Sequence, residues 1–157
     1  MLFPFFQWCE ASWLGQLVRE SVWLFPAIEA VHLLGLCLLG GALLVVDLRL
    51  MGFGLRNQPV ALIARSARPW LMAGVAVLLI TGVLLFMSEA VKCYYNPSFR
   101  VMITTLPFAL LFTFAVRERV ASRLEFVTSW KSRLIATVSL MLWFTVAMAG
   151  RWIGFSS

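Results

Sequence analysis

Four long stretches of this chain are almost free of charge, and they constrain its fold more than any other feature. They cover residues 22–46, 69–90, 99–116 and 134–150, and each contains at most one charged side chain. A helix of about 17–25 apolar residues is long enough to cross the hydrocarbon core of a bilayer. The four stretches therefore predict an all-α fold with four transmembrane helices.

The composition agrees with that prediction. Of the 157 residues, 62% are hydrophobic and 13% are charged, whereas roughly 25% of the residues of a soluble domain are charged. A soluble domain of this length would still expose about 30% of the surface of its unfolded chain, and this chain has too few polar residues for that. We expect one integral membrane domain over residues 1–157, folded as an up-down-up-down helix bundle because its connections are short.

The segment before the first span is too polar to cross a membrane. In residues 5–18, Trp13, Leu14 and Leu17 share one helical face with Phe6, and polar side chains lie on the other face. This pattern is typical of a short helix that lies in the membrane interface. The N-terminus lacks the basic region and cleavage site of a signal peptide, so we expect the first span to be retained as an anchor.

The distribution of cations predicts the orientation. The chain has a net charge of +6 from 13 Lys and Arg against 7 Asp and Glu. Nine cations follow the first and third spans: Arg49, Arg56, Arg65, Arg68, Arg117, Arg119, Arg123, Lys131 and Arg133. The positive-inside rule places those two loops in the cytoplasm and both termini outside. Membrane lipid is the expected partner of these cations, and nucleic acid is not.

Two prolines mark the middle spans. Pro69 is expected to open the second span beside the interfacial Trp70. Pro107 lies within the third span, where a proline removes a backbone hydrogen bond. We therefore expect a kink that frees the carbonyl near Ile103.

The first span carries a polar stripe. Its members are spaced by three or four residues and so share one helical face: Glu29, His32, Leu36, Gly40, Leu43 and Asp47. Charged groups facing lipid are costly, so the stripe should face the bundle interior or a protein partner. Asp47, at the inner end, is expected to pair with Arg49 or with another basic loop residue.

His32 is the only histidine and the main candidate for a functional residue. One interpretation is a neutral imidazole that is hydrogen-bonded to Glu29 or to a neighbouring helix. A second is a haem b or metal ligand. The second ligand would then be His32 of another copy of the chain, or a methionine. The candidates are Met87, Met102 and Met148, which are expected at the same level as His32. A third is a proton or quinone site with Glu29 and Arg151 as supporting groups.

A second group of charges is expected near the outer ends of the helices. Its members are Glu89, Lys92, Arg100 and Arg151. They can form an ion-pair network that joins helix ends, or they can bind a small anion or a quinone headgroup together with Glu29 and His32.

The three cysteines have no metal-binding spacing. Cys37 lies inside the first span and is expected to be a small buried apolar residue. Cys9 and Cys93 are expected on the same outer face, where they can form a disulfide or remain two thiols.

No catalytic motif is present. The chain has no G-x-S-x-G, no glycine-rich phosphate loop and no H-E-x-x-H. The leading hypothesis is a non-enzymatic subunit of a homo- or hetero-oligomeric membrane complex. A redox module that binds haem b or quinone around His32 is the alternative, and transport of a metal ion or proton is the third.

Several segments resemble a known family. They are Glu29-Ala-Val-His32, Asp47-Leu-Arg-Leu50, Asn96-Pro-Ser-Phe-Arg100 and Ala149-Gly-Arg151. Together they are similar to an uncharacterised bacterial family of four-helix inner-membrane proteins, a domain of unknown function. The resemblance covers nearly the whole chain and implies the fold and the membrane, with no activity.

Two further points qualify the resemblance. The family often carries a lysine at position 102, and asparagine and histidine at the inner end of the third span. This chain has Met102, Phe112 and Arg117 there, so a polar pathway through that span is not implied. A looser similarity, to small copper-resistance and b-type cytochrome membrane proteins, rests on His32 and on Thr81-Gly82.

Overall fold

The computed structural model describes residues 3–54, 57–124 and 129–155, and every regular element within them is helical. Four helical stretches are long and apolar enough to cross a membrane. They are α3 (Leu24–Met51), α4 (Val60–Ser88), α8 (Trp130–Ile153), and α6 (Pro97–Phe112) continued by η1 (Thr113–Arg117) and α7 (Glu118–Ala121). The predicted all-α fold with four transmembrane helices is confirmed.

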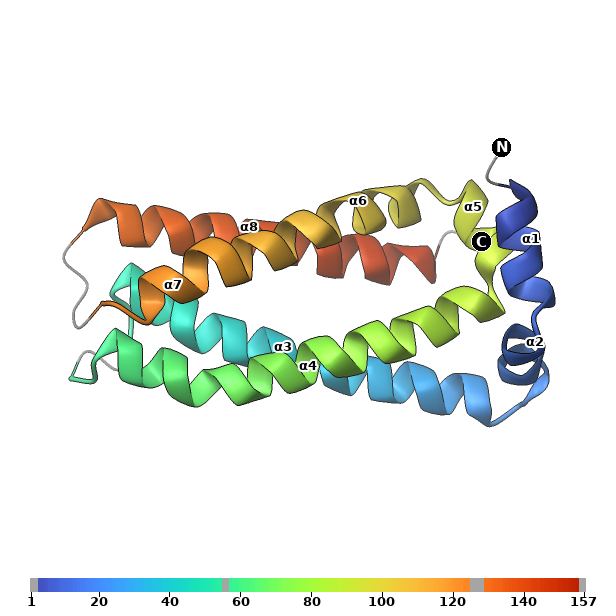
Figure 1. Cartoon of the computed structure of the whole chain (residues 1–157), viewed down its shortest axis with the longest axis horizontal. Helices are drawn as coiled ribbons and strands as arrows, with labels where there is room; N and C mark the ends of the chain where they lie inside the picture. Colours follow the sequence, from blue (N-terminus) through green and yellow to red (C-terminus); the bar gives the residue numbers. More distant parts are fainter. Residues whose placement is uncertain (1–2, 55–56, 125–128, 156–157) are drawn as a thin grey trace.

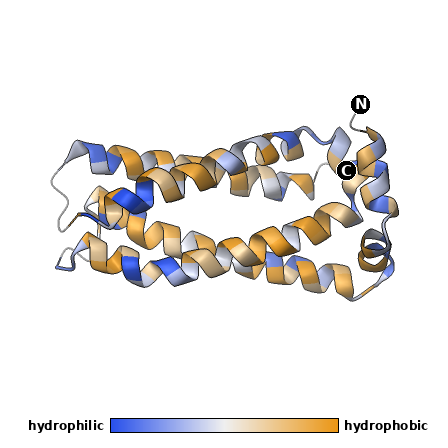
Figure 2. Cartoon of the chain, in the orientation of Figure 1, coloured by the Kyte–Doolittle hydropathy of each residue, from blue (hydrophilic) through white to orange (hydrophobic). Residues whose placement is uncertain are grey.

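The four long stretches run along one axis, and both termini lie at the same end (Figure 1). Helix α3 packs against α4 and α8, and α6 packs against α8. We call the end with the termini the terminal end, and the end with the α3–α4 and α7–α8 connections the loop end. Hydrophobic residues fill the middle of the helices, and hydrophilic residues gather toward the two ends (Figure 2).

The helices extend beyond the apolar stretches of the sequence. Helix α4 begins at Val60 rather than at Pro69, which lies inside it. A proline is tolerated there because Pro69 is exposed, and the carbonyl it leaves unbonded lies one turn back toward the polar loop end. The other three stretches likewise continue past the apolar sequence at the loop end: α3 to Met51, α7 to Ala121, and α8 from Trp130.

The third stretch does not break at Pro107. Helix α6 continues through that proline, and its irregularity lies further on, in the π-helical turn Thr113–Arg117. A π turn inserts an extra residue into the helix and so changes which side chains face the bundle. Its effect here is that Thr113 and Arg117 are both buried.

Close contact between α3 and α4 depends on two glycines. A Cβ added at Gly74 would lie 2.9 Å from the backbone nitrogen of Leu39, and one at Gly35 would lie 2.8 Å from a methyl group of Val77. Neither position has room for a side chain. Small residues allow transmembrane helices to pack this closely, so α3 and α4 form the tightest pair of the bundle.

Two short helices cover the terminal end, where one was expected. They are α1 (Phe3–Ala11) and α2 (Trp13–Glu20), separated at Ser12. The Ser12 hydroxyl accepts a hydrogen bond from Gly15 N at 3.2 Å and donates one to Cys9 O at 2.5 Å, so it caps α2. Helix α1 packs on α5 (Ala90–Tyr95), and α2 packs on α4.

This break separates the apolar residues that were expected on one face. Phe6 turns toward the bundle, with its ring 5.4 Å from that of Phe86. Trp13, Leu14 and Leu17 are instead exposed. The predicted common face was wrong because the helical period does not continue through Ser12.

Candidate functional site around His32

His32 points from α3 toward α4. Its Nδ1 lies 2.7 Å from Thr81 Oγ1, and the Thr81 hydroxyl donates to Val77 O at 2.6 Å. A hydroxyl has one proton to give. Since Thr81 gives it to the backbone, Nδ1 carries the imidazole proton and donates to Thr81. The neutral ring therefore has its lone pair on Nε2.

That lone pair is available. No hydrogen bond to Nε2 is present among the described residues. Within that part of the chain every enclosed side-chain nitrogen or oxygen has a partner, so Nε2 lies at an accessible surface. Gly82 lies beside the ring, and a Cβ there would be 3.4 Å from His32 Cε1. The structure thus brings together the histidine and the Thr81-Gly82 pair.

Glu29 lies one helical turn before His32 and is exposed. No hydrogen bond or ion pair of its side chain occurs in the described part of the chain. The expectation that it faces the bundle interior is not met within one chain. No described residue of this chain therefore shields the Glu29 carboxylate from lipid.

Arg151 lies elsewhere. It is exposed, and its guanidinium lies over the ring of Phe155, with Cζ 4.9 Å from the centroid. No contact joins it to His32 among the described residues. The ring contact accounts for its position by a cation–π interaction.

The three methionines expected at the level of His32 have different surroundings. Met102 packs into the core beside Gly150, and Met148 is 43% exposed on α8. Met87 is half-buried on α4. In the described residues, no three His, Cys, Asp or Glu side chains are placed to hold a metal ion.

The charges near the terminal end form separate contacts rather than one network. Lys92 Nζ lies 3.7 Å from Glu89 Oε2, and Arg100 donates to Tyr94 O at 3.2 Å. Arg151 stacks on Phe155. These contacts account for each charge locally, so the predicted joint ion-pair network was wrong.

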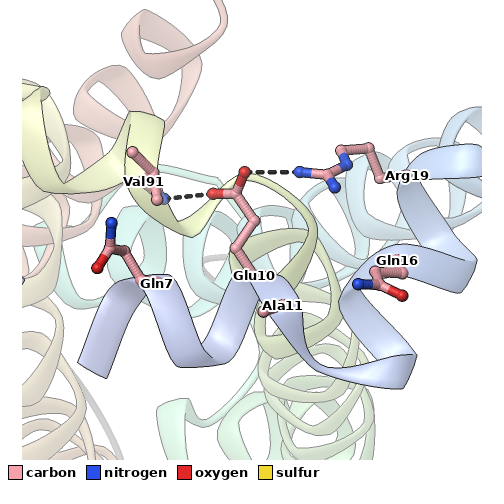
Figure 3. Close-up of a pocket in the computed structure, with 6 residues that line it drawn as sticks. All are labelled: Gln7, Glu10, Ala11, Gln16, Arg19 and Val91. Atoms are coloured by element: carbon pink, nitrogen blue, oxygen red, sulfur yellow. Dashed lines mark hydrogen bonds and ion pairs between the residues drawn. The ribbon is translucent and has the colours of Figure 1, made fainter. Parts of the chain in front are cut away.

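Glu10 makes the stronger polar contacts at this end. Its Oε2 accepts from Val91 N at 2.7 Å, and its Oε1 accepts from Arg19 at 2.6 Å (Figure 3). The carboxylate thereby joins α1, α2 and the first turn of α5. It borders an open pocket of about 270 Å³ that is also lined by Gln7 and Gln16. Sequence reasoning placed Glu10 only on a polar face.

Asp47 pairs with a basic residue at the loop end, as expected, but the partner is Arg117 and the pair is buried. Arg117 Nε donates to Asp47 Oδ1 at 2.6 Å, and Arg117 Nη2 donates to Leu43 O at 3.1 Å. Ser139 donates to Asp47 Oδ2 at 2.8 Å. Arg117 and Asp47 are 1% and 0% exposed. This cluster joins α3, the π turn and α8.

Next to that cluster, Trp143 Nε1 donates to Thr113 Oγ1 at 2.9 Å. Both side chains are buried. Arg117 had been assigned to a loop, but the π turn carries it into the bundle. Asp47 requires a counter-ion inside the bundle, and this requirement was the sequence signal that could have predicted the burial of Arg117.

The three cysteines are free thiols. Cys37 is exposed, contrary to the expectation of a buried residue. Cys9 and Cys93 are buried on α1 and α5, which pack together. Burial, and secondarily the charge of Glu89, raise the pKa of Cys93 to about 11.

Most of the segments that carry the family resemblance have a structural role. Asp47, Arg49 and Leu50 are buried. Asn96 caps α6 by accepting from Ser98 N at 2.9 Å. In the Glu29-x-x-His32 segment, the Glu29 carboxylate and His32 Nε2 have no hydrogen-bond partner among the described residues.

The fold and its polar groups define a four-helix membrane bundle capped at one end by short helices. A model of a family of unknown function (DUF6644) matches residues 5–156. The chain belongs to this family. No curated protein and no solved structure matches the chain.

Proposed function

We propose that this chain is a non-enzymatic subunit of an oligomeric membrane complex, and that the outward face of α3 contacts the neighbouring subunit. The supporting observation is a series of exposed residues at alternating spacings of four and three, which we call the α3 seam: Ala30, Leu34, Cys37, Gly41, Leu44 and Leu48. A spacing that averages 3.5 residues keeps one stripe of a helix against a partner helix over many turns. Contact with lipid requires no such register.

The glycines of α3 support the same proposal. Gly35 is packed against α4, whereas an added Cβ at Gly40 or Gly41 would meet nothing within 4 Å. A glycine inside a helix costs about 1 kcal/mol relative to alanine. Gly41 has no packing role within the chain, and a second helix approaching closely would supply one.

A second copy of the chain is the simplest neighbour, because a two-fold axis beside α3 would set the seam against itself. Cys37 then lies near its counterpart. Mild oxidation of native membranes should produce a disulfide-linked dimer through Cys37, since Cys9 and Cys93 are buried. The dimer should be absent in Cys37→Ser. A dimer that persists in that variant would contradict the seam.

Association can be tested without a cysteine. Gly41→Leu should lower the fraction of oligomer in mild detergent, because the larger side chain separates the helices. Ala76→Leu is the matched control, since Ala76 is an exposed small residue of α4. Equal loss of oligomer in both variants would count against the seam, and a strictly monomeric wild type without a co-purifying partner would remove the proposal.

The second candidate is a redox module that binds haem b or a quinone at His32. It is favoured by the accessible Nε2 lone pair, which can ligate iron or accept a proton from a quinol hydroxyl. Glu29 lies one turn away on the exposed side. The other iron ligand would be His32 of a second copy or one of Met87, Met102 and Met148, and Arg151 would support a quinone headgroup.

An absorption spectrum separates the two candidates. A Soret band, or quinone in the organic extract, would support the redox module, and His32→Ala should remove it while the bundle stays folded. Absence of both from protein purified in mild detergent would remove this candidate. The subunit proposal does not depend on that outcome.

We further propose a bacterial inner membrane location with periplasmic termini. Of the nine cations counted in the sequence after the first and third spans, Arg49 and Arg117 are buried, and the remaining seven still outnumber the four counted on the other side. In a Cys37→Ser background, Tyr95→Cys should react with an impermeant maleimide in spheroplasts, and Arg123→Cys should react only after permeabilisation. The reverse result would invert the orientation.

A further inference from the structure

We propose that the loop end of the bundle binds the phosphate of an anionic phospholipid, in a pocket between the end of α3 and the start of α8. The pocket holds about 280 Å³ and is lined by Met51, Gly52, Phe53, Arg133 and Thr137. No described contact or known relative assigns it a role. This inference rests on the membrane location and is independent of the α3 seam and of His32.

Arg133 supplies the charge for this site. Its side chain is exposed and has no hydrogen bond or ion pair within the described chain. Two other arginines at the loop end differ from it: Arg49 donates to Gln58 O at 2.8 Å, and Arg117 is paired with Asp47. Arg133 is therefore free to form the charge-assisted, two-pronged contact that a phosphate accepts from a guanidinium.

The surroundings of the pocket favour an anion. Lys131 lies two residues before Arg133, and both lie in the first turns of α8, whose positive end attracts negative charge. The opposing negative end of α3 is closed: Gly52 N donates to Arg49 O at 3.0 Å, and Phe53 N donates to Leu48 O at 2.9 Å. Two of the carbonyls that would repel a phosphate are thus already bonded.

The charge at this end selects among lipids. In the described chain it carries Arg65, Arg68, Arg119 and Arg123 in addition to the cations above, and only Asp47 and Glu118 as acids. Both acids are in ion pairs. A zwitterionic headgroup would place its ammonium among unpaired cations, whereas an anionic headgroup adds only negative charge.

The apolar part of the pocket fits a lipid better than a free anion. Phe53 is 61% exposed, and Trp130 at the start of α8 is 70% exposed. Aromatic rings at this level are typical of the membrane interface. A lipid that places its phosphate on Arg133 can cover the Phe53 ring with its glycerol and upper acyl chain.

The test uses the purified full-length protein in neutral detergent, titrated with phosphatidylglycerol or phosphatidylcholine and followed by native mass spectrometry and thermal unfolding. Phosphatidylglycerol should bind and raise the melting temperature. Arg133→Gln should weaken its binding by about fivefold, the loss expected for one interfacial cation. Arg100→Gln removes an exposed arginine at the terminal end of the bundle and should leave binding unchanged.

Three results would overturn the proposal. One is equal binding of phosphatidylglycerol by wild type and Arg133→Gln. Another is equal binding of the two lipids by wild type. The third is the same stabilisation by inorganic phosphate as by phosphatidylglycerol, which would identify a free-anion site instead.

Discussion

The guanidinium of Arg117 lies 2.6 Å from the carboxylate of Asp47, and the two residues are 70 positions apart in the sequence. Neither side chain has contact with solvent or lipid. Ser139 satisfies the second carboxylate oxygen. This pair joins the first transmembrane helix to the third, and the serine adds the fourth.

Removing one member of the pair should destabilise the bundle strongly. Arg117→Ala leaves the Asp47 carboxylate buried without its counter-ion, an effect of about 3–5 kcal/mol for buried pairs. Unfolding in a mixed-micelle titration would measure it. Arg119→Ala, at an exposed site on the same turn, should change stability by less than about 0.5 kcal/mol. The double variant Asp47→Leu, Arg117→Met should recover much of the loss, and failure to do so would argue against a primarily electrostatic role.

Thr81→Val should leave the His32 Nδ1–H without an acceptor. Hydrogen bonds between transmembrane helices contribute about 0.6 kcal/mol on average and at most about 1.7 kcal/mol, so we expect a loss in this range. Thr104→Val is the control, because Thr104 bonds only to carbonyls of its own helix. Equal losses of stability in the two variants would show that the hydrogen bond between His32 and Thr81 does not stabilise the bundle.

The effect of a glycine substitution on stability should depend on whether the glycine contacts another helix. Gly74→Ala places a Cβ 2.9 Å from the Leu39 backbone, and overpacking of this kind costs about 1–3 kcal/mol. Gly40→Ala meets open space, so it should be neutral or stabilising by up to about 1 kcal/mol. Thermal unfolding of both variants in the same detergent checks the prediction. A greater loss for Gly40→Ala would contradict the close contact of α3 and α4.

Cys93 should resist alkylation at neutral pH. Its pKa is raised to about 11 from 9.0, so the reactive thiolate is scarce. Because the raised pKa belongs to the folded state, the stability from the neutral thiol is complete below pH 9 and is lost as the pH rises toward 11. Labelling followed by mass spectrometry should show protection at pH 7 that disappears on unfolding, with Tyr95→Cys as an exposed reference. Rapid labelling of Cys93 in the folded protein would contradict its burial.

Hydropathy was sufficient to predict the four transmembrane helices, because crossing a bilayer depends on the local length of apolar sequence. It could not predict partners. Asp47 was recognised as a charge that needs a partner, but Arg117 was assigned to a loop because its burial depends on a π turn. The N-terminal segment was predicted as one helix because a serine inside a helix and a serine at a cap differ only in their hydrogen bonds.

The residues of the candidate site were predicted from the sequence, but their contacts were not. A single polar stripe on the first span identified His32, and the Thr81-Gly82 pair was noted separately. Their contact depends on the register between α3 and α4, which Gly35 and Gly74 set. Glu29 lies about 60° around the helix from His32, enough to turn it out of the bundle. Sequence spacing alone does not distinguish those two directions.

The distance of 70 residues between Asp47 and Arg117 also bears on biosynthesis. The first transmembrane helix leaves the ribosome long before the third, so its aspartate must enter or border the bilayer without a counter-ion. An unpaired aspartate at the middle of a membrane helix costs about 2.5–3.5 kcal/mol on insertion scales. The leucine-rich remainder of the first helix offsets this cost, and the helix is held in the membrane until the arginine arrives. Formation of the ion pair then fixes the depth of the first helix, which makes this contact a late step in assembly rather than a condition for insertion.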